Sequence, residues 1–132
     1  MRIIVTGTRR QVGRRPAFLF FADLCEVYEP EEVTIVHGAC PTGVDAMAQR
    51  YAVQSGFKVE RFPADWTKHG RRAGPIRNQA MVDAGADMAW AYKPRFDRLS
   101  SKGGGTEDCV GRALTAGIPV WLVDLVNPPG WC

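Results

Sequence analysis

Short apolar runs alternate along the chain with longer segments in which apolar residues recur every three or four positions. Five of these runs predict β-strands, at residues 2–6, 33–37, 57–62, 87–92 and 120–123. A continuous apolar run is typical of a strand whose two faces are both covered, as in a parallel sheet. The third run also carries Lys58, Glu60 and Arg61, which predicts an exposed edge strand.

Four segments between the strands predict helices. The clearest begins at Val44, because apolar residues recur from there at helical spacing until Gly56. Further helices are predicted at residues 16–30, 75–84 and 106–117, and loops at 63–74 and 93–103. Strands that alternate with helices predict an α/β fold in which helices cover both faces of a parallel sheet. The pattern itself leaves the order of the strands open.

The first predicted helix is apolar on more than one face, because Phe18, Leu19, Phe20 and Phe21 follow one another. A surface helix needs apolar side chains on only about one face. The excess predicts a homodimer, or an assembly built from dimers, that packs through residues 17–28. A deeply buried helix in a single chain is the alternative reading.

The chain has 132 residues, of which 45% are hydrophobic and 23% charged, and a net charge of +3, which is ordinary for one globular domain. We expect that domain at residues 1–126, followed by a turn-like tail at 127–132. No apolar run reaches the roughly 18 residues of a membrane span, and a strand begins at once at the N-terminus. These features predict a cytoplasmic protein without a membrane contact. The four cysteines show no Cys-x-x-Cys spacing, so we expect no metal, and nothing in the sequence indicates a cofactor.

Three glycine-bearing turns lie where predicted strands lead into helices, at residues 6–9, 37–45 and 102–106. In a parallel sheet such turns emerge together at the carboxyl edge, where ligands bind. Glycine lets backbone N–H groups approach a phosphate, and a following helix N-terminus favours its negative charge. The turns therefore predict a pocket for a nucleotide or a sugar phosphate, with the third turn as the strongest single motif.

Polar and aromatic side chains near these turns complete the predicted site. Arg77 and Asn78 begin a helix, where a guanidinium and an amide could bind phosphate or ribose. Asp45 could accept a hydrogen bond from a ribose hydroxyl, and Trp66, beside Asp65, could stack on a base. Each of these residues also has a structural alternative, as a helix cap, a surface ion pair, a first-turn acid or a cover of the sheet edge. The predicted ligand-binding residues are Gly7, Thr8, Arg9, Gly38, Gly43, Asp45, Asp65, Trp66, Arg77, Asn78, Gly103, Gly104, Gly105 and Thr106.

Together these residues resemble the SLOG superfamily, and within it the YspA, cpYpsA-related branch; the superfamily also includes the Lonely Guy phosphoribohydrolases and the DNA-processing protein DprA. The resemblance covers residues 1 to about 124, and its motifs are Gly7-Thr8-Arg9, the turn at 37–45 with Ala39 in place of a glycine, Ala64-Asp65-Trp66, Ala73-Gly74-Pro75-Ile76-Arg77-Asn78-Gln79-Ala80-Met81 and Gly103-Gly104-Gly105-Thr106. It implies a Rossmann-like three-layer α/β/α fold whose five parallel strands have the order 3-2-1-4-5. It also implies a nucleotide-derived ligand, such as a sugar phosphate or ADP-ribose, and a bacterial or phage origin.

The similarity to Lonely Guy enzymes breaks at one position. Those enzymes have a catalytic Glu where this chain, aligned on Gly105-Thr106, has Cys109. We therefore expect a binding protein, with a hydrolase of the N-glycosidic bond in a nucleotide as the alternative. Such a hydrolase would stabilise an oxocarbenium-like centre with a carboxylate, and the candidates are Asp45, Asp65, Glu107 and Asp108. A second alternative, binding of single-stranded DNA, depends on basic clusters at residues 9–15 and 68–72 and on the resemblance to DprA.

Overall fold

Five parallel strands form one sheet at the centre of the molecule. The computed structural model describes residues 1–9, 14–93 and 105–124, and in the first helix it describes side chains only from Phe21 onward. The strands are β1 (Arg2–Gly7), β2 (Thr34–His37), β3 (Lys58–Arg61), β4 (Met88–Lys93) and β5 (Val120–Asp124). Their order in the sheet is β3-β2-β1-β4-β5, and every neighbouring pair is parallel. This confirms the Rossmann-like α/β fold, the strand order and the position of β3 at an edge.

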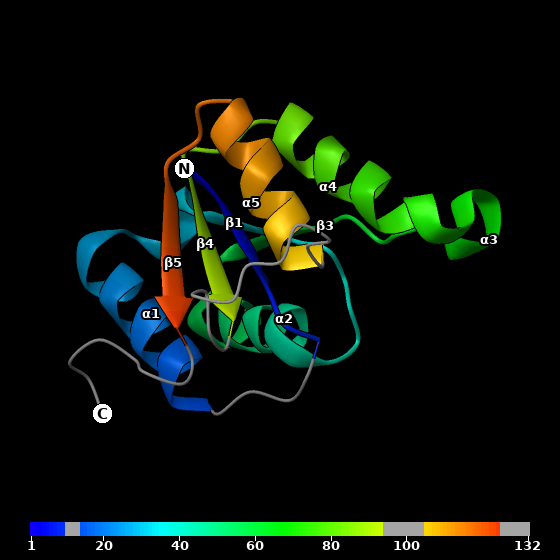
Figure 1. Ribbon diagram of the computed structural model, residues 1–132. Helices are drawn as coiled ribbons and strands as arrows, with labels where there is room; N and C mark the ends of the chain where they lie inside the picture. Colours follow the sequence, from blue (N-terminus) through cyan, green and yellow to red (C-terminus); the bar gives the residue numbers. More distant parts are fainter. Residues whose placement is uncertain (10–13, 94–104, 125–132) are drawn as a thin grey trace.

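Helices cover both faces of the sheet (Figure 1). They are α1 (Arg14–Val27) and α2 (Gly43–Ser55) on one face, and α4 (Ala73–Asp83) and α5 (Gly105–Thr115) on the other. Successive side chains of a strand point to opposite faces, so Ile3 and Val5 of β1 join the core under α1 and α2, whereas Ile4 joins the core under α4 and α5. The apolar run of β1 is therefore buried on both sides, as its sequence predicts.

The stretch that the sequence predicts as a loop, residues 63–74, is mostly helical. It contains α3 (Trp66–His69) and a 3₁₀ turn (Gly70–Arg72), and α4 follows directly at Ala73. The loop prediction was wrong because this segment has no apolar periodicity that would indicate a helix. The helix α3 begins at a local cap instead: the Asp65 carboxylate accepts a hydrogen bond from the Lys68 backbone N–H at 3.0 Å. α3 projects from the body of the molecule at the start of α4 (Figure 1).

The apolar helix α1 packs into the core through its described half. Phe21 and Leu24 are buried, and the ring of Phe21 lies 6.2 Å from that of Tyr51 and 5.8 Å from that of Phe57, centroid to centroid. The side chains of residues 18–20, on which the predicted dimer contact depends, lie outside the described part. The dimer through residues 17–28 therefore stays a prediction. None of the helices in the described ranges is both long enough and apolar enough to cross a membrane.

Candidate functional site

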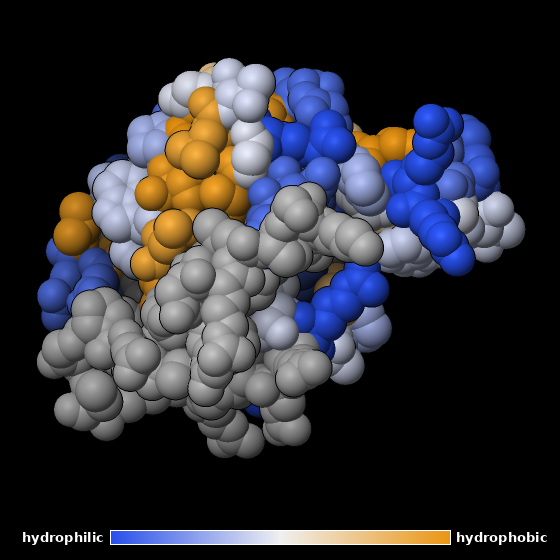
Figure 2. All heavy atoms as spheres, viewed as in Figure 1, coloured by the Kyte–Doolittle hydropathy of each residue, from blue (hydrophilic) through white to orange (hydrophobic). Residues whose placement is uncertain are grey.

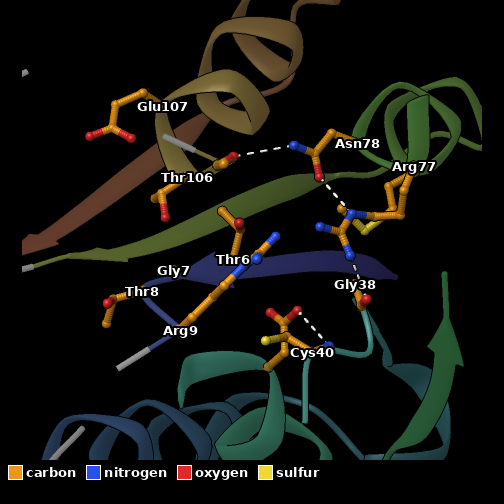
Figure 3. Close-up of a pocket in the computed structure, with 13 residues that line it drawn as sticks. Thr6, Gly7, Thr8, Arg9, Gly38, Cys40, Arg77, Asn78, Thr106 and Glu107 are labelled. Atoms are coloured by element: carbon orange, nitrogen blue, oxygen red, sulfur yellow. Dashed lines mark hydrogen bonds between the residues drawn. The ribbon is translucent and has the colours of Figure 1, made fainter. Parts of the chain in front are cut away.

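A cavity of about 460 Å³ opens at the carboxyl edge of the sheet, between the ends of the central strands and the first turns of the flanking helices (Figure 3). It lies where the parallel topology brings the strand-to-helix turns together. The residues that line it are Thr6, Gly7, Thr8, Arg9, Gly38, Cys40, Asp45, Arg77, Asn78, Met81, Gly105, Thr106 and Glu107.

Two of the glycines near this edge are required by the packing of the protein itself. A Cβ on Gly7 would lie 2.4 Å from the Tyr92 carbonyl oxygen. A Cβ on Gly43 would lie 2.1 Å from the Thr8 carbonyl oxygen, and Gly43 has a left-handed φ of 73°. The same Thr8 oxygen accepts a hydrogen bond from the Val44 N–H at 3.0 Å. The absence of side chains at these two positions lets the end of β1 pack closely against the start of α2. The close packing explains both glycines without any phosphate ligand.

Arg77 reaches from α4 across the cavity wall to the second glycine turn. Its Nη1 donates a hydrogen bond to the Gly38 carbonyl oxygen, and its Nε donates to Asn78 Oδ1 at 2.8 Å. A Cβ on Gly38 would lie only 2.2 Å from Arg77 Nη1, so position 38 must be glycine for the guanidinium to lie there. The remaining nitrogen, Nη2, turns toward the cavity (Figure 3). The guanidinium is thus held in place by two contacts and presents its free edge to a ligand.

Asn78 is buried and joins α4 to the start of α5. Its Nδ2 donates to the Gly105 carbonyl oxygen at 3.2 Å and to Asp108 Oδ2 at 3.0 Å. The same Asp108 oxygen accepts a hydrogen bond from Arg112 Nε at 2.8 Å. Because the amide also accepts from Arg77, all of its polar atoms are engaged within the protein. Asn78 therefore fixes the guanidinium and the first turn of α5 relative to each other.

The four candidate carboxylates lie in different surroundings. Asp45 and Glu107 line the cavity, whereas Asp65 and Asp108 do not. Burial raises the pKa of Asp45, and this effect outweighs the hydrogen bond from the Cys40 N–H to Asp45 Oδ2, at 3.2 Å, and the positive charge of Arg77. Burial also acts to raise the pKa of Asp108, but the hydrogen bonds from Arg112 and Asn78 prevail and lower it. Asp45 is therefore the buried carboxyl of the cavity, and Asp108 belongs to the contacts between α4 and α5.

The second glycine turn is held by a buried histidine beneath it. His37 Nδ1 accepts a hydrogen bond from the Ala39 N–H at 3.0 Å, and Nε2 lies 2.7 Å from Gln49 Oε1. Because Nδ1 accepts, the ring proton is on Nε2 and points to Gln49. Ala39, which replaces the glycine of the SLOG motif, keeps a left-handed φ of 60°. Both ring nitrogens are taken, so His37 supports the turn rather than facing a ligand.

Cys109, at the position of the Lonely Guy glutamate, lies in the core behind the cavity. It is fully buried in the cluster under α4 and α5. Burial raises its pKa to about 11, even though the Thr6 side chain and the charge of Arg77 act in the opposite direction. At neutral pH this side chain is a protonated thiol, which cannot stabilise a positive centre.

A second hollow of about 270 Å³ adjoins the cavity on the side of α3. Arg9, Gly38, Cys40 and Arg77 line both spaces. Its other lining residues are Ala39, Pro41, Pro63, Ala64 and Trp66. The Arg9 guanidinium carbon lies 5.2 Å from the centroid of the Trp66 ring, within cation–π range. Lys68, Arg71 and Arg72, from the basic cluster at residues 68–72, are exposed on the part of the molecule that projects with α3. Figure 2 shows hydrophilic side chains gathered there.

Most of the predicted site residues that the structure describes come together. Those that line the main cavity are Gly7, Thr8, Arg9, Gly38, Asp45, Arg77, Asn78, Gly105 and Thr106, with Glu107 from the catalytic candidates. Trp66 lines the second hollow, and Asp65 caps α3. Gly43 does not line the cavity and packs against the Thr8 carbonyl oxygen. Gly103 and Gly104 lie outside the described residues. The sequence reasoning gave no role to Thr6, Cys40 and Met81. Met81 could have been found from its place one helical turn after Arg77. In the described ranges no three His, Cys, Asp or Glu side chains are grouped so that they could hold a metal ion.

Comparison with known proteins agrees with this architecture. The sequence profile of the YspA, cpYpsA-related SLOG family matches residues 1–69. The chain is also similar to the Gene 61 protein of Mycobacterium phage D29, with 38% identity over 125 residues, which cover 90% of this chain and 93% of the phage protein. The phage protein's similarity extends over the α4 and α5 half of the site, which the family profile does not reach.

Proposed function

Because the chain belongs to the YspA, cpYpsA-related SLOG family, we propose that it binds a nucleotide or a nucleotide-derived ligand in the cavity at the carboxyl edge. The observation that carries the proposal is the pairing of a fixed cation with a buried carboxyl in one cavity. Arg77 is held by Gly38 and Asn78, and Asp45 lines the same space. A guanidinium suits phosphate, and a carboxylate suits ribose hydroxyls.

Preorganisation is what distinguishes Arg77 from a surface arginine. An arginine that must be ordered on binding loses side-chain entropy, which reduces the affinity that its hydrogen bonds contribute. Here two nitrogens are already bonded inside the protein, so the cavity-facing edge is presented in a fixed orientation. Arg9 lines the same cavity and adds a second positive charge. The N-terminus of α5, at Gly105 and Thr106, adds backbone N–H groups that favour an anion.

Thermal-shift screening against AMP, ADP, ADP-ribose and cyclic nucleotides tests the proposal. A ligand at one hundred times its dissociation constant should stabilise the protein by ~2.7 kcal/mol. Arg77→Gln should weaken that ligand by about 10- to 100-fold, because a charge-assisted hydrogen bond contributes roughly 1.5–3 kcal/mol. Arg50→Gln is the matched control, since Arg50 is exposed on α2 and lines neither hollow. A flat response to the whole panel, or equal binding by the two variants, would contradict the proposal.

The burial of Asp45 favours one second function, hydrolysis of the N-glycosidic bond of a bound nucleotide. A carboxyl whose pKa is raised inside a ligand cavity is a candidate for acid–base or electrostatic catalysis. Glu107 lines the same cavity and is the other carboxylate within reach. Asp108 is engaged by Arg112 and Asn78, which leaves it a structural role.

Release of adenine from AMP, followed by chromatography, tests this second function. If the protein is a hydrolase, Asp45→Asn or Glu107→Gln should abolish the release, while Asp108→Asn should keep most of it. No adenine from the native protein would reject hydrolysis of this substrate. Adenine release that survives both cavity variants would show that neither carboxylate takes part.

A further inference from the structure

The hollow beside α3 has the features of a site for a flat aromatic group. It adjoins the main cavity, and the two spaces share Arg9, Gly38 and Arg77 in their walls. The hollow therefore lies directly beside the main cavity, within reach of a ligand bound there. The hollow ends at the indole of Trp66 and at Pro63 and Ala64, which are all apolar surfaces.

Trp66 is exposed although its ring is held in place. About 49% of its surface is accessible, so the indole does not serve only to fill the core. The ring edge lies over Gly74, where a Cβ would come within 3.5 Å of Cη2. Arg9 lies over the ring, and the Asp65 cap fixes the start of α3. An exposed indole in a fixed position is a stacking surface that needs little further ordering.

We propose that Trp66 is the platform for the base of a nucleotide whose sugar and phosphate occupy the main cavity. The ligand passes between Arg9 and Arg77, which line both spaces and carry the charges that its phosphate needs. The inference depends on the proposed function and adds to it a ligand class, nucleotides that keep their aromatic base. A sugar phosphate without a base would leave the hollow empty.

AMP and ribose 5-phosphate form the matched pair of probes, because ribose 5-phosphate has a hydroxyl at C1 where AMP has the base. Isothermal titration should show that the native protein binds AMP at least about fivefold more tightly than ribose 5-phosphate, since stacking of one base on an aromatic side chain contributes about 1–3 kcal/mol by alanine substitution, a 5- to 150-fold effect. Trp66→Ala should bring the affinity for AMP down to that for ribose 5-phosphate and leave the latter unchanged. Trp66→Phe should keep most of the preference for AMP.

Trp121→Ala is the control for loss of an exposed tryptophan. Trp121 has 46% of its surface accessible, stacks on Trp90 in the sheet and lines neither hollow, so its loss should leave both affinities unchanged. If Trp66→Ala does not fold, fluorescence replaces it. AMP should then quench the emission of the native protein and leave that of Trp66→Phe, which keeps three tryptophans, nearly unchanged.

Three results would overturn the inference, and they differ in what else they overturn. Equal affinities for AMP and ribose 5-phosphate, both reduced by Arg77→Gln, would reject the base site and leave the proposed cavity intact. An AMP preference that survives Trp66→Ala would do the same. Absence of binding by both probes would reject the base site, and a flat response to the whole thermal-shift panel would reject the proposed function as well.

Discussion

Ala39 occupies a backbone position that favours glycine, so Ala39→Gly should stabilise the protein. Ala39 has a φ of 60°, in the left-handed region, and it is the only residue other than glycine with a positive φ in the described ranges. Its N–H donates to His37 Nδ1 at 3.0 Å, which fixes the turn in this conformation. In the SLOG motif the corresponding residue is a glycine, which adopts this conformation without a clash of its Cβ.

The expected gain follows from two opposing terms. A left-handed conformation costs an L-residue with a Cβ roughly 1–2 kcal/mol, and glycine removes this cost. Glycine also gives the unfolded chain more freedom, which costs about 0.5–1 kcal/mol relative to alanine. The difference is a stabilisation of about 0.5–1 kcal/mol. For a domain of this size it corresponds to a rise in melting temperature of about 2–4 °C.

Urea denaturation and thermal melting measure the effect, and Ala80→Gly is the matched control. Ala80 is exposed within α4, where the same substitution should destabilise the protein by about 1 kcal/mol. The two variants make the same chemical change and should therefore shift the free energy of unfolding in opposite directions. If Ala39→Gly destabilises the protein as much as Ala80→Gly does, the left-handed backbone at Ala39 is refuted.

The remaining predictions concern pH, nucleic acid and assembly. The pKa of Asp45 is higher in the folded protein than its value near 3.8 in the unfolded chain, so its protonated carboxyl stabilises the fold at low pH. This stability is lost as the pH rises through the folded-state pKa. Asp45→Asn should therefore gain stability relative to the native protein between pH 4 and 7 in urea titrations. The lowered pKa of Asp108 acts in the opposite sense, so Asp108→Asn should lose up to about 1 kcal/mol at pH 7 and nothing below the folded pKa. If the basic clusters at 9–15 and 68–72 bind single-stranded DNA, a gel shift at low salt should weaken steeply as salt rises, by ~0.7 in log affinity per phosphate contact for each log unit of salt; no shift at low salt rejects that role. Light scattering at micromolar concentration should give the mass of a dimer, and a mass of 14.6 kDa rejects it.

The layers of the fold could be predicted from the sequence because burial leaves a clear pattern. Ile3, Ile4 and Val5 are all buried, and an unbroken apolar run is what a central parallel strand requires. The mixed charges of β3 likewise predict its place at the edge, which the structure confirms. The order of the strands could not be obtained this way, since pairing is decided by contacts between distant segments. It came from the family resemblance alone.

The location of the cavity could be predicted from the sequence, whereas the contacts among the residues that line it could not. Parallel topology sends every strand-to-helix turn to the same edge, so the glycine turns located the cavity. Position 38 requires a glycine because the guanidinium of Arg77 fills the space that a side chain would need, and Arg77 lies 39 residues further along the chain. Asn78 and Asp108 are separated by 30 residues, and no local pattern relates them. Contacts at such separations are fixed only when the helices pack.

Cys109 lies where the Lonely Guy enzymes have their catalytic glutamate, and its reactivity tests whether this position is buried. Hydrolysis by the Lonely Guy mechanism requires an ionised carboxylate at this position, and a buried thiol with a pKa of about 11 supplies neither charge nor nucleophile. At pH 7.5 only on the order of one such thiol in several thousand is ionised. Iodoacetamide should therefore modify the partly exposed Cys40 in the folded protein and modify Cys109 only after urea has unfolded it, as read by peptide mass spectrometry. Equal labelling of both cysteines in the native state would show that Cys109 faces the cavity, and a catalytic role for that position would have to be considered again.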